Sequence, residues 1–298
     1  MLLELFEGEI LESIKKVNLN FLQEIRLREN AYATCLYGGS WYFLGKSGLD
    51  NREFNALKIN ENQLNRIVQK ASSNSLYTVS NELKKGYITF KNGIRIGISG
   101  LCVFDESGSV KTISKITSLC IRVPHLIPNA SKEIFNKTDL LNNLKNLLII
   151  SPAGCGKTTL LKDIAYTLSK YNQNNVVIID EKDEFSALKG QGLYLDIITG
   201  TNKFLGINFA ICNLNPKVII TDEIGFKDDY DAILKASVMG SNIICSKHGE
   251  NLEDIKNDLD FNNLLQKQIF DYFVILENKV GKGIIKHIYD KNLKLLEF

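Results

Sequence analysis

The sequence lacks the features of a membrane-spanning, secreted or nucleic-acid-binding protein. No apolar run in its 298 residues approaches the ~20 residues that a membrane-spanning helix needs. The opening stretch, MLLELFEGEILESI, is apolar but acidic, without the basic start or small-residue cleavage site of a secretory signal. A formal net charge of +2 gives no strong positive field for nucleic acid or an anionic membrane. We therefore expect a cytoplasmic protein that is peripheral to any membrane and reaches it through a partner.

The sequence also lacks closely spaced cysteine pairs, and it has no arginine after residue 122. The six cysteines are scattered without a C-x-x-C pair, and their spacing suits neither a zinc site nor a disulfide framework. Cys102, Cys120 and Cys245 lie in apolar, strand-like runs, so we expect reduced thiols in the core. Any guanidinium that the second half of the chain needs must come from the first half, because all the arginines lie there, at positions 26, 28, 52, 66, 95 and 122.

Proline marks a boundary between two parts of the chain. Two of the four prolines fall in PHLIPN, at 124–129, which is typical of a linker. Short strand-like runs and turns around one amphipathic helix precede it, and they predict a smaller N-terminal α+β domain of residues 1–123. The elements expected there are strands at 24–28, 31–37, 41–45 and 119–123, a helix at 59–73, a hairpin at 87–100 that turns at Asn92-Gly93, and a second hairpin turning at 105–109.

Residues 130–298 alternate buried-type strands with helices. This pattern is typical of a parallel sheet covered by helices on both faces, so we predict an α/β fold with a RecA-like P-loop domain. The strands are expected at 146–151, 175–180, 195–199, 217–223, 242–246, 272–277 and 283–290, and the helices at 158–170, 203–214 and 228–239.

The stretch SPAGCGKTTLLKDI, residues 151–164, predicts a phosphate-binding loop. It fits G-x-x-x-x-G-K-[ST] except that Ser151 replaces the first glycine, where a small residue can end the strand. Gly154 and Gly156 permit the tight backbone that wraps N–H groups around phosphates at a helix N-terminus. Lys157 can reach the β- and γ-phosphates, and Thr158 can bind Mg²⁺. The residues expected around ATP are Pro152, Ala153, Gly154, Cys155, Gly156, Lys157, Thr158 and Thr159.

Two buried strands end in carboxylate pairs, and either pair could complete the site. VVIIDE ends in Asp180-Glu181, and KVIITDE ends in Asp222-Glu223. Chain order favours the second pair, because it makes the 176–180 strand peripheral and places the 218–222 strand beside the loop strand. Asp222 is then the predicted Mg²⁺ ligand and Glu223 the residue that orients and deprotonates water. A solvated strand end is the alternative for each pair, and it carries more weight for 180–181 than for 222–223.

A further strand, in ICSKHGE, ends near polar side chains. Ser246 or His248 could sense the γ-phosphate or position water there, although a lone histidine after a strand is more often a structural hydrogen-bonding group.

Four segments in this order resemble the hexameric traffic ATPases of type II and type IV secretion. They are SPAGCGKTTLLKDIA, VVIIDEKDE, LNPKVIITDEIG and SKHGENLEDI. The resemblance is strongest to their sporulation relatives, the stage III AA family, and it extends to EIRLR and NELKKGYITFKNGIRIGISG in the first half.

The resemblance implies a Mg²⁺-dependent, hexameric cytosolic ATPase that energises a membrane channel between mother cell and forespore, with a membrane protein of that channel as partner. It makes Asp180, Glu181 and Glu184 the acidic box, so that Glu181 joins Glu223 and Lys157 as a candidate catalytic residue. It makes His248 the histidine box. The sequence departs from the family where arginines usually flank the acidic strand, and Phe226 stands at one of those places.

The missing arginines leave alternatives open. A nucleotide-gated assembly module that turns over negligibly is one, and a nucleic-acid-dependent RecA-like ATPase is another, although the near-neutral charge speaks against the latter. If hydrolysis is fast, the cation at the γ-phosphate must be a lysine or an arginine of residues 1–122. Arg95 and Arg122 are the preferred donors, followed by Arg26 and Arg28.

Overall fold

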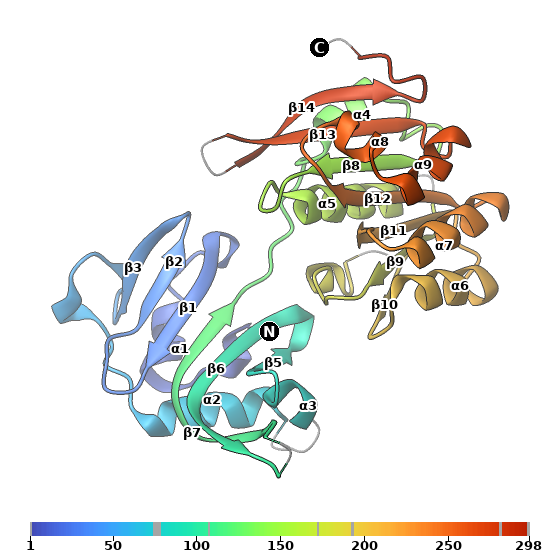
Figure 1. Cartoon of the computed structure of the whole chain (residues 1–298). Helices are drawn as coiled ribbons and strands as arrows, with labels where there is room; N and C mark the ends of the chain where they lie inside the picture. The colour runs from blue at the N-terminus through green and yellow to red at the C-terminus, as the bar shows by residue number, and fades with distance from the viewer. Residues whose placement is uncertain are drawn as a thin grey trace. The chain divides into compact units, whose positions relative to one another are not determined.

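In a computed structural model of the protein, the chain forms two compact units. The structure describes residues 2–73, 79–106, 108–171, 173–191, 194–279 and 282–296. Unit 1 comprises Met1–His125 and unit 2 Leu126–Phe298; they run from blue to green and from green to red in Figure 1. No helix in the described ranges is long and apolar enough to cross a membrane.

Unit 1 is built on an antiparallel sheet of seven strands in the order β4-β3-β2-β1-β7-β6-β5. Its helices bury their apolar faces with those of the strands in one core, which contains Leu5, Ile14, Ile25, Leu64 and Ile121. The elements are β1 (Leu22–Arg28), β2 (Thr34–Tyr37), β3 (Ser40–Gly45), β4 (Gly48–Asp50), β5 (Tyr87–Phe90), β6 (Ile94–Phe104), β7 (Val110–Arg122), α1 (Gly8–Ile14), α2 (Glu61–Ala71), α3 (Ser80–Leu83) and the 3-10 helices Leu2–Leu5, Leu19–Phe21, Glu53–Asn55 and Lys91–Gly93.

The predicted strands, helix and hairpins of unit 1 are present, with further short elements among them. Asn92 and Gly93 adopt positive φ angles of 54° and 71°, as the turn between β5 and β6 requires. The sequence reading missed α1, which has no amphipathic repeat long enough to detect, and the three-residue strand β4. One residue of the predicted turn at 105–109, Ser107, lies outside the described residues.

Unit 2 is a seven-stranded sheet in the order β10-β9-β11-β12-β8-β13-β14, parallel except for the antiparallel pair β13–β14. Its elements are β8 (Leu147–Ser151), β9 (Val176–Asp180), β10 (Leu195–Thr199), β11 (Val218–Glu223), β12 (Asn242–His248), β13 (Tyr272–Lys279), β14 (Lys282–Asp290), α4 (Lys132–Lys137), α5 (Lys157–Lys170), α6 (Lys203–Asn213), α7 (Lys227–Val238), α8 (Leu252–Lys256), α9 (Leu259–Gln266) and the 3-10 helix Ser186–Leu188.

Alternate residues of these strands enter two separate cores. One core packs Ile149, Ile178 and Ile220 against α5, and the other packs Ile179 and Ile219 against α6, α7 and α9. Figure 1 shows the strands of unit 2 side by side between these helices. Burial on both faces explains the uninterrupted apolar runs from which the parallel sheet was predicted.

The strand order corrects one expectation. β12, not β11, pairs with the loop strand β8, so the predicted neighbour of the loop strand lies one strand further away. Chain order could not reveal this, because β12 follows β11 in the sequence yet inserts between β11 and β8. The insertion pairs His248 at the end of β12 with Ser151 at the end of β8. The carboxylates of β11 and the histidine therefore lie at neighbouring strand ends, near the predicted phosphate-binding loop between β8 and α5, which is named the phosphate loop.

The cysteine prediction is wrong at two positions. Cys245 is buried as expected, and its pKa is raised by burial. Cys102 is exposed on β6, and Cys120 is only half-buried. A strand-like apolar run does not distinguish the two faces of a sheet when only one face is covered.

Candidate functional site

The phosphate loop connects β8 to α5 at the carboxyl edge of the sheet. Gly154 and Gly156 have φ angles of 75° and 81°, which residues other than glycine rarely adopt. Cys155 points inward and is buried, while Ala153 and Gly154 are exposed at the tip. Ser151 is fully buried, and its hydroxyl donates to the Pro152 carbonyl at 2.9 Å. The serine thus closes the strand without disturbing the loop.

Two side chains at the start of α5 engage neighbouring groups. The Lys157 ammonium donates to the carbonyls of Ser151 and Pro152, at 3.0 and 3.2 Å. The Thr158 hydroxyl donates to Glu184 Oε2 at 2.6 Å. Thr159 follows on the helix and is half-buried. Both predicted phosphate-site side chains are therefore at the loop, and Thr158 is tied to the segment that follows β9.

That segment, residues 180–185, is called the acidic loop below, and Asp180 organises it. The buried Asp180 carboxylate accepts the backbone N–H groups of Glu184 and Phe185, both at 2.8 Å. Burial raises the pKa of Asp180, and these two hydrogen bonds oppose the rise. Its oxygens shape the loop, and Glu184 is the residue that reaches the phosphate loop.

The second carboxylate pair closes β11. Asp222 is 4% exposed, and burial raises its pKa while Lys203 lowers it in part. Neither of its carboxylate oxygens accepts a hydrogen bond within the described part of the chain. Lys203 Nζ lies 3.2 Å from Asp222 Oδ1, an ion pair without hydrogen-bond alignment. Asp222 therefore presents a buried carboxylate with unused lone pairs.

Glu223 is surrounded by positive or titratable groups. Its Oε1 lies 3.9 Å from both Lys157 Nζ and His248 Nδ1, and its Oε2 lies 3.8 Å from Lys182 Nζ. These distances exceed those of direct hydrogen bonds. The Glu223 side chain is 39% exposed and that of His248 is 63% exposed. Both can therefore meet a bound molecule.

The geometry separates the two candidate pairs. The structure gathers Lys157, Glu223 and His248 at one point. Thr158 follows Lys157 in α5, and Asp222 precedes Glu223 in β11. Glu181 is directed to Lys203, at 2.6 Å, and no contact joins it to Glu223. Ser246 is buried on β12. The sequence reading missed Lys182 and Lys203, because a lysine after an acidic strand or at a helix start is normally solvated.

The residues present fit Mg²⁺. The Thr158 hydroxyl and the Asp222 carboxylate are hard oxygen donors, and Asp222 has unsatisfied oxygens. Within the described ranges, no group of three His, Cys, Asp or Glu side chains forms a metal cluster. A Mg²⁺ ion carried by nucleotide phosphates and water needs only one or two protein oxygens. The donor set therefore suits a metal that arrives with a nucleotide.

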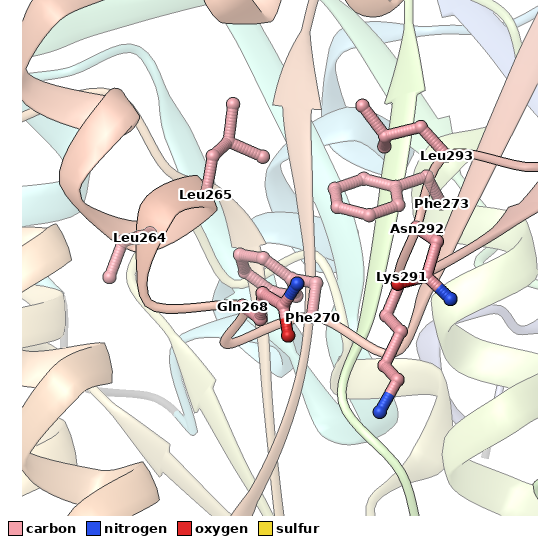
Figure 2. A pocket seen from close by; sticks show the side chains of 8 residues that line it. All are labelled: Leu264, Leu265, Gln268, Phe270, Phe273, Lys291, Asn292 and Leu293. Carbon is pink, nitrogen blue, oxygen red and sulfur yellow. The ribbon is translucent and has the colours of Figure 1, made fainter.

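A separate cavity of about 330 Å³ lies at the opposite edge of the same sheet. Phe273, one of its walls, pairs with Leu148 near the amino end of β8, whereas the phosphate loop follows the carboxyl end. Figure 2 shows the side chains from α9, the segment between α9 and β13, β13 itself and the segment after β14 around it. The residues that line it are Leu264, Leu265, Gln268, Phe270, Phe273, Lys291, Asn292 and Leu293.

Three of the six arginines of unit 1 line a pocket of about 340 Å³. Arg26, Arg95 and Arg122 line it together with Lys85, and Arg28 does not. Arg95 stacks on Tyr87, with its guanidinium carbon 3.8 Å from the ring centre. In the register of β6 and β7, Arg95 lies opposite Arg122, a pairing of like charges that is unfavourable by itself. Glu24, which pairs with Arg26 and Arg122, supplies negative charge beside it.

Comparisons with solved structures show the class of fold. The chain matches the pilus retraction motor PilT, solved with bound ADP, with a TM-score of 0.60 and 16% identity, over 95% of this chain and 82% of PilT. It matches the Legionella pneumophila ATPase DotB with a TM-score of 0.55 and 14% identity, over 91% and 77% of the two chains. The chain therefore has the fold of the secretion and pilus ATPases.

Sequence comparison narrows the class to one family. The model of the family "Sporulation stage III, protein AA" matches residues 3–296. Stage III sporulation protein AA of Bacillus subtilis is 32% identical over 92% of this chain and 89% of its own length. The chain belongs to this sporulation family.

Proposed function

We propose that the protein is a Mg²⁺-dependent ATPase of the secretion type. The observation that carries the proposal is the meeting of Lys157, Glu223 and His248 at one edge of the sheet, beside Thr158 and the unsatisfied Asp222. The fold shared with secretion and pilus ATPases and the membership of a sporulation family support it. Residues 1–123 would act as an N-terminal domain, 124–129 as a linker and 130–298 as the ATPase domain.

Each side chain has a separate task in this proposal. Lys157 leaves the carbonyls of its own loop to hold the β- and γ-phosphates. Thr158 and Asp222 hold Mg²⁺, and the bound ion supplies charge neutralisation of the phosphates. Glu223 orients a water molecule and accepts its proton, and His248, 3.9 Å from Glu223, adjusts the position of that water or contacts the γ-phosphate.

The working form that we propose is a homo-oligomer, a hexameric ring, in the cytoplasm. It would be peripheral to a membrane protein of a secretion-like channel, on the mother-cell side of a sporulating cell. The family assignment and the absence of a membrane-spanning helix among the described residues support this location. Affinity purification from sporulating cells, followed by identification of the co-purified membrane protein, tests it.

Lys157→Ala tests the site itself. We expect this variant to lose ATP turnover and most nucleotide affinity, because Lys157 is the only lysine of the loop that can reach the β- and γ-phosphates. Fluorescence titration with a labelled ADP and a phosphate-release assay measure the two losses. Lys170→Ala is the matched control, since Lys170 is exposed at the far end of the same helix. Full activity of Lys157→Ala would refute the site assignment.

One observation favours a second function, a nucleotide-gated assembly module with negligible turnover. Unit 2 contains no arginine, and lysine does not reproduce the bidentate contact of a guanidinium with phosphate. The pocket of unit 1 that holds Arg26, Arg95 and Arg122 supports the ATPase instead, because Arg95 stacks on Tyr87 without a carboxylate partner among the described residues and can turn to an anion. Turnover per protomer, measured against Glu223→Gln as the blank, separates the two functions.

A further inference from the structure

Lys203 occupies a position that is unfavourable for a lysine. It is the first residue of α6, after the capping residue Asn202, and it is 4% exposed. Burial of an ammonium group costs several kcal/mol, and the partial positive charge at a helix N-terminus repels a cation. A lysine at this position therefore needs strong compensating contacts.

Two carboxylates provide the compensation. Lys203 Nζ donates to Glu181 Oε2 at 2.6 Å and lies 3.2 Å from Asp222 Oδ1. Glu181 belongs to the acidic loop after β9, and Asp222 is near the end of β11, the strand that pairs with β9. The ammonium thus connects two neighbouring strand ends. Asp222 accepts no hydrogen bond from the described residues, so this ion pair is the contact that orients its carboxylate.

The backbone of α6 brings Lys203 into place. A Cβ added at Gly206 would lie 2.6 Å from Ile179 Cγ2 and 3.0 Å from Thr201 Cγ2. Only glycine therefore lets the first turn of α6 lie so close to β9. Lys189, another lysine near the acidic loop, is placed differently: it pairs with Asp183 at 3.2 Å but is 42% exposed. Exposed pairs of that kind contribute little to geometry or stability.

We propose that Lys203 is a positioning residue of the magnesium–nucleotide site. It holds the Asp222 carboxylate at the end of β11 and the acidic loop at Glu181 in one fixed arrangement, so that the Mg²⁺-dependent part of nucleotide affinity depends on it. This inference rests on the proposed function. It assigns no catalytic step to Lys203, whose ammonium is occupied by the two carboxylates.

Lys203→Met separates the charge from the packing. Methionine keeps most of the length and volume of the buried side chain but removes both contacts. Loss of a group that orients a metal ligand typically lowers metal affinity by ~10- to 100-fold. We expect the gain in nucleotide affinity on adding Mg²⁺ to fall by ~10-fold or more. Affinity in EDTA should stay within about twofold, because Lys157 and the phosphate loop are unchanged.

The experiment titrates the full-length protein with a fluorescent ADP analogue, in EDTA and over a series of Mg²⁺ concentrations. Lys189→Met is the matched control, and its Mg²⁺ response should equal that of the wild type. Lys203→Arg, which keeps the charge, should recover most of the response. A wild-type response in Lys203→Met, or an equal loss in Lys203→Met and Lys203→Arg, would overturn the inference.

Two outcomes need separate treatment. If Lys203→Met does not fold, Glu181→Gln decides, because it removes one anchor and leaves Lys203 beside Asp222. A several-fold weaker Mg²⁺ response in Glu181→Gln supports the inference, and an unchanged response overturns it. If the wild-type protein binds no magnesium nucleotide at all, the proposed function fails, and the inference fails with it.

Discussion

Unit 2 contains no arginine, so lysines supply the strongly basic side chains around its carboxylates. Lys157, Lys182 and Lys203 surround the carboxylates at the ends of β9 and β11. A lysine ammonium is a compact charge on a flexible stem, so its effect depends on how firmly its surroundings hold it. Lys203 is held by burial and two carboxylates, whereas Lys182 is 54% exposed and lies 3.8 Å from Glu223. The ammonium group of Lys203 is therefore held in one position, whereas that of Lys182 is free of such constraints.

Substitutions in the two carboxylate pairs, Asp222-Glu223 and Asp180-Glu181, should have different effects on turnover. Glu223→Gln should bind ATP normally and turn over at least ~10²-fold more slowly, the usual effect of losing a general base. Glu181→Gln should retain more activity, because Glu181 contacts Lys203 and is not joined to the cluster of Lys157 and His248. Phosphate release at saturating ATP measures both. A severe loss in Glu181→Gln with a nearly silent Glu223→Gln would show that the general base belongs to the other pair.

At the same scale, the sequence predicted which side chains meet but not how they are held. The motif placed Lys157 and Thr158 at a helix start, and the strand pattern placed Glu223 and His248 at strand ends. Their meeting follows because the carboxyl ends of parallel strands share one edge. Lys203 was not predicted, because the residues that bury it come from segments far apart in the sequence.

At the scale of elements, the helices and strands of unit 2 were largely predicted, and their order in the sheet was not. Apolar runs bounded by polar residues identify strands. Which strand pairs with which, however, depends on how the helices that connect the strands pack on the sheet. β12 inserts between β11 and β8, which brings His248 next to the phosphate loop. The short helices α8 and α9 were missed because neither spans enough turns to give a clear period.

A cluster of Lys247, Tyr230 and Asp258 fixes α9 to β12. Lys247 Nζ lies 2.7 Å from Asp258 Oδ2 and donates to Tyr230 Oη at 2.6 Å. Asp258 also accepts the Phe261 N–H at 3.0 Å as the cap of α9. Burial raises the pKa of Asp258, but the hydrogen bonds from Lys247, Phe261 and Tyr230 together lower it by more. The pKa therefore lies below its ordinary value. The cluster joins α7, α9 and β12 and lies directly before His248.

Asp258→Asn should destabilise unit 2 by about 1–3 kcal/mol at neutral pH, because it leaves the buried Lys247 without its carboxylate. The pKa of Asp258 is depressed, so its contribution is fully present above the unfolded value of ~3.9 and is lost as the pH falls through the folded value. The difference between the wild type and the variant should therefore shrink below about pH 4. Urea unfolding at several pH values measures it.

Asp260→Asn is the control for this measurement, since Asp260 is exposed in the first turn of the same helix. Its effect should be small at every pH. A loss of stability equal to that of Asp258→Asn, or a difference that grows in acid, would contradict the assignment of the cluster.

At the scale of the whole molecule, the chain divides its charged groups between the two units. Unit 2 contains the phosphate loop and the carboxylates at the ends of β9 and β11, and unit 1 contains every arginine. Arg95 stacks on Tyr87, and no carboxylate of the described residues pairs with it. Arg122 is 67% exposed and its Nε lies 3.5 Å from Glu24 Oε2, so Arg95 has the guanidinium that is easier to redirect to a phosphate.

An arginine that assists hydrolysis would have to come from unit 1. An arginine at a γ-phosphate in transfer contributes roughly 10³–10⁵ in rate, and unit 2 has none to offer. We expect Arg95→Ala, and to a lesser extent Arg122→Ala, to lower turnover by orders of magnitude while nucleotide affinity changes little. A truncated protein of residues 126–298, which keeps the complete core of unit 2, should be similarly slow. Arg52→Ala is the control, because Arg52 contacts Phe54 and Asp50 away from the arginine pocket. If the assembled truncated protein hydrolyses ATP as fast as the full chain, a lysine of unit 2 supplies the cation instead.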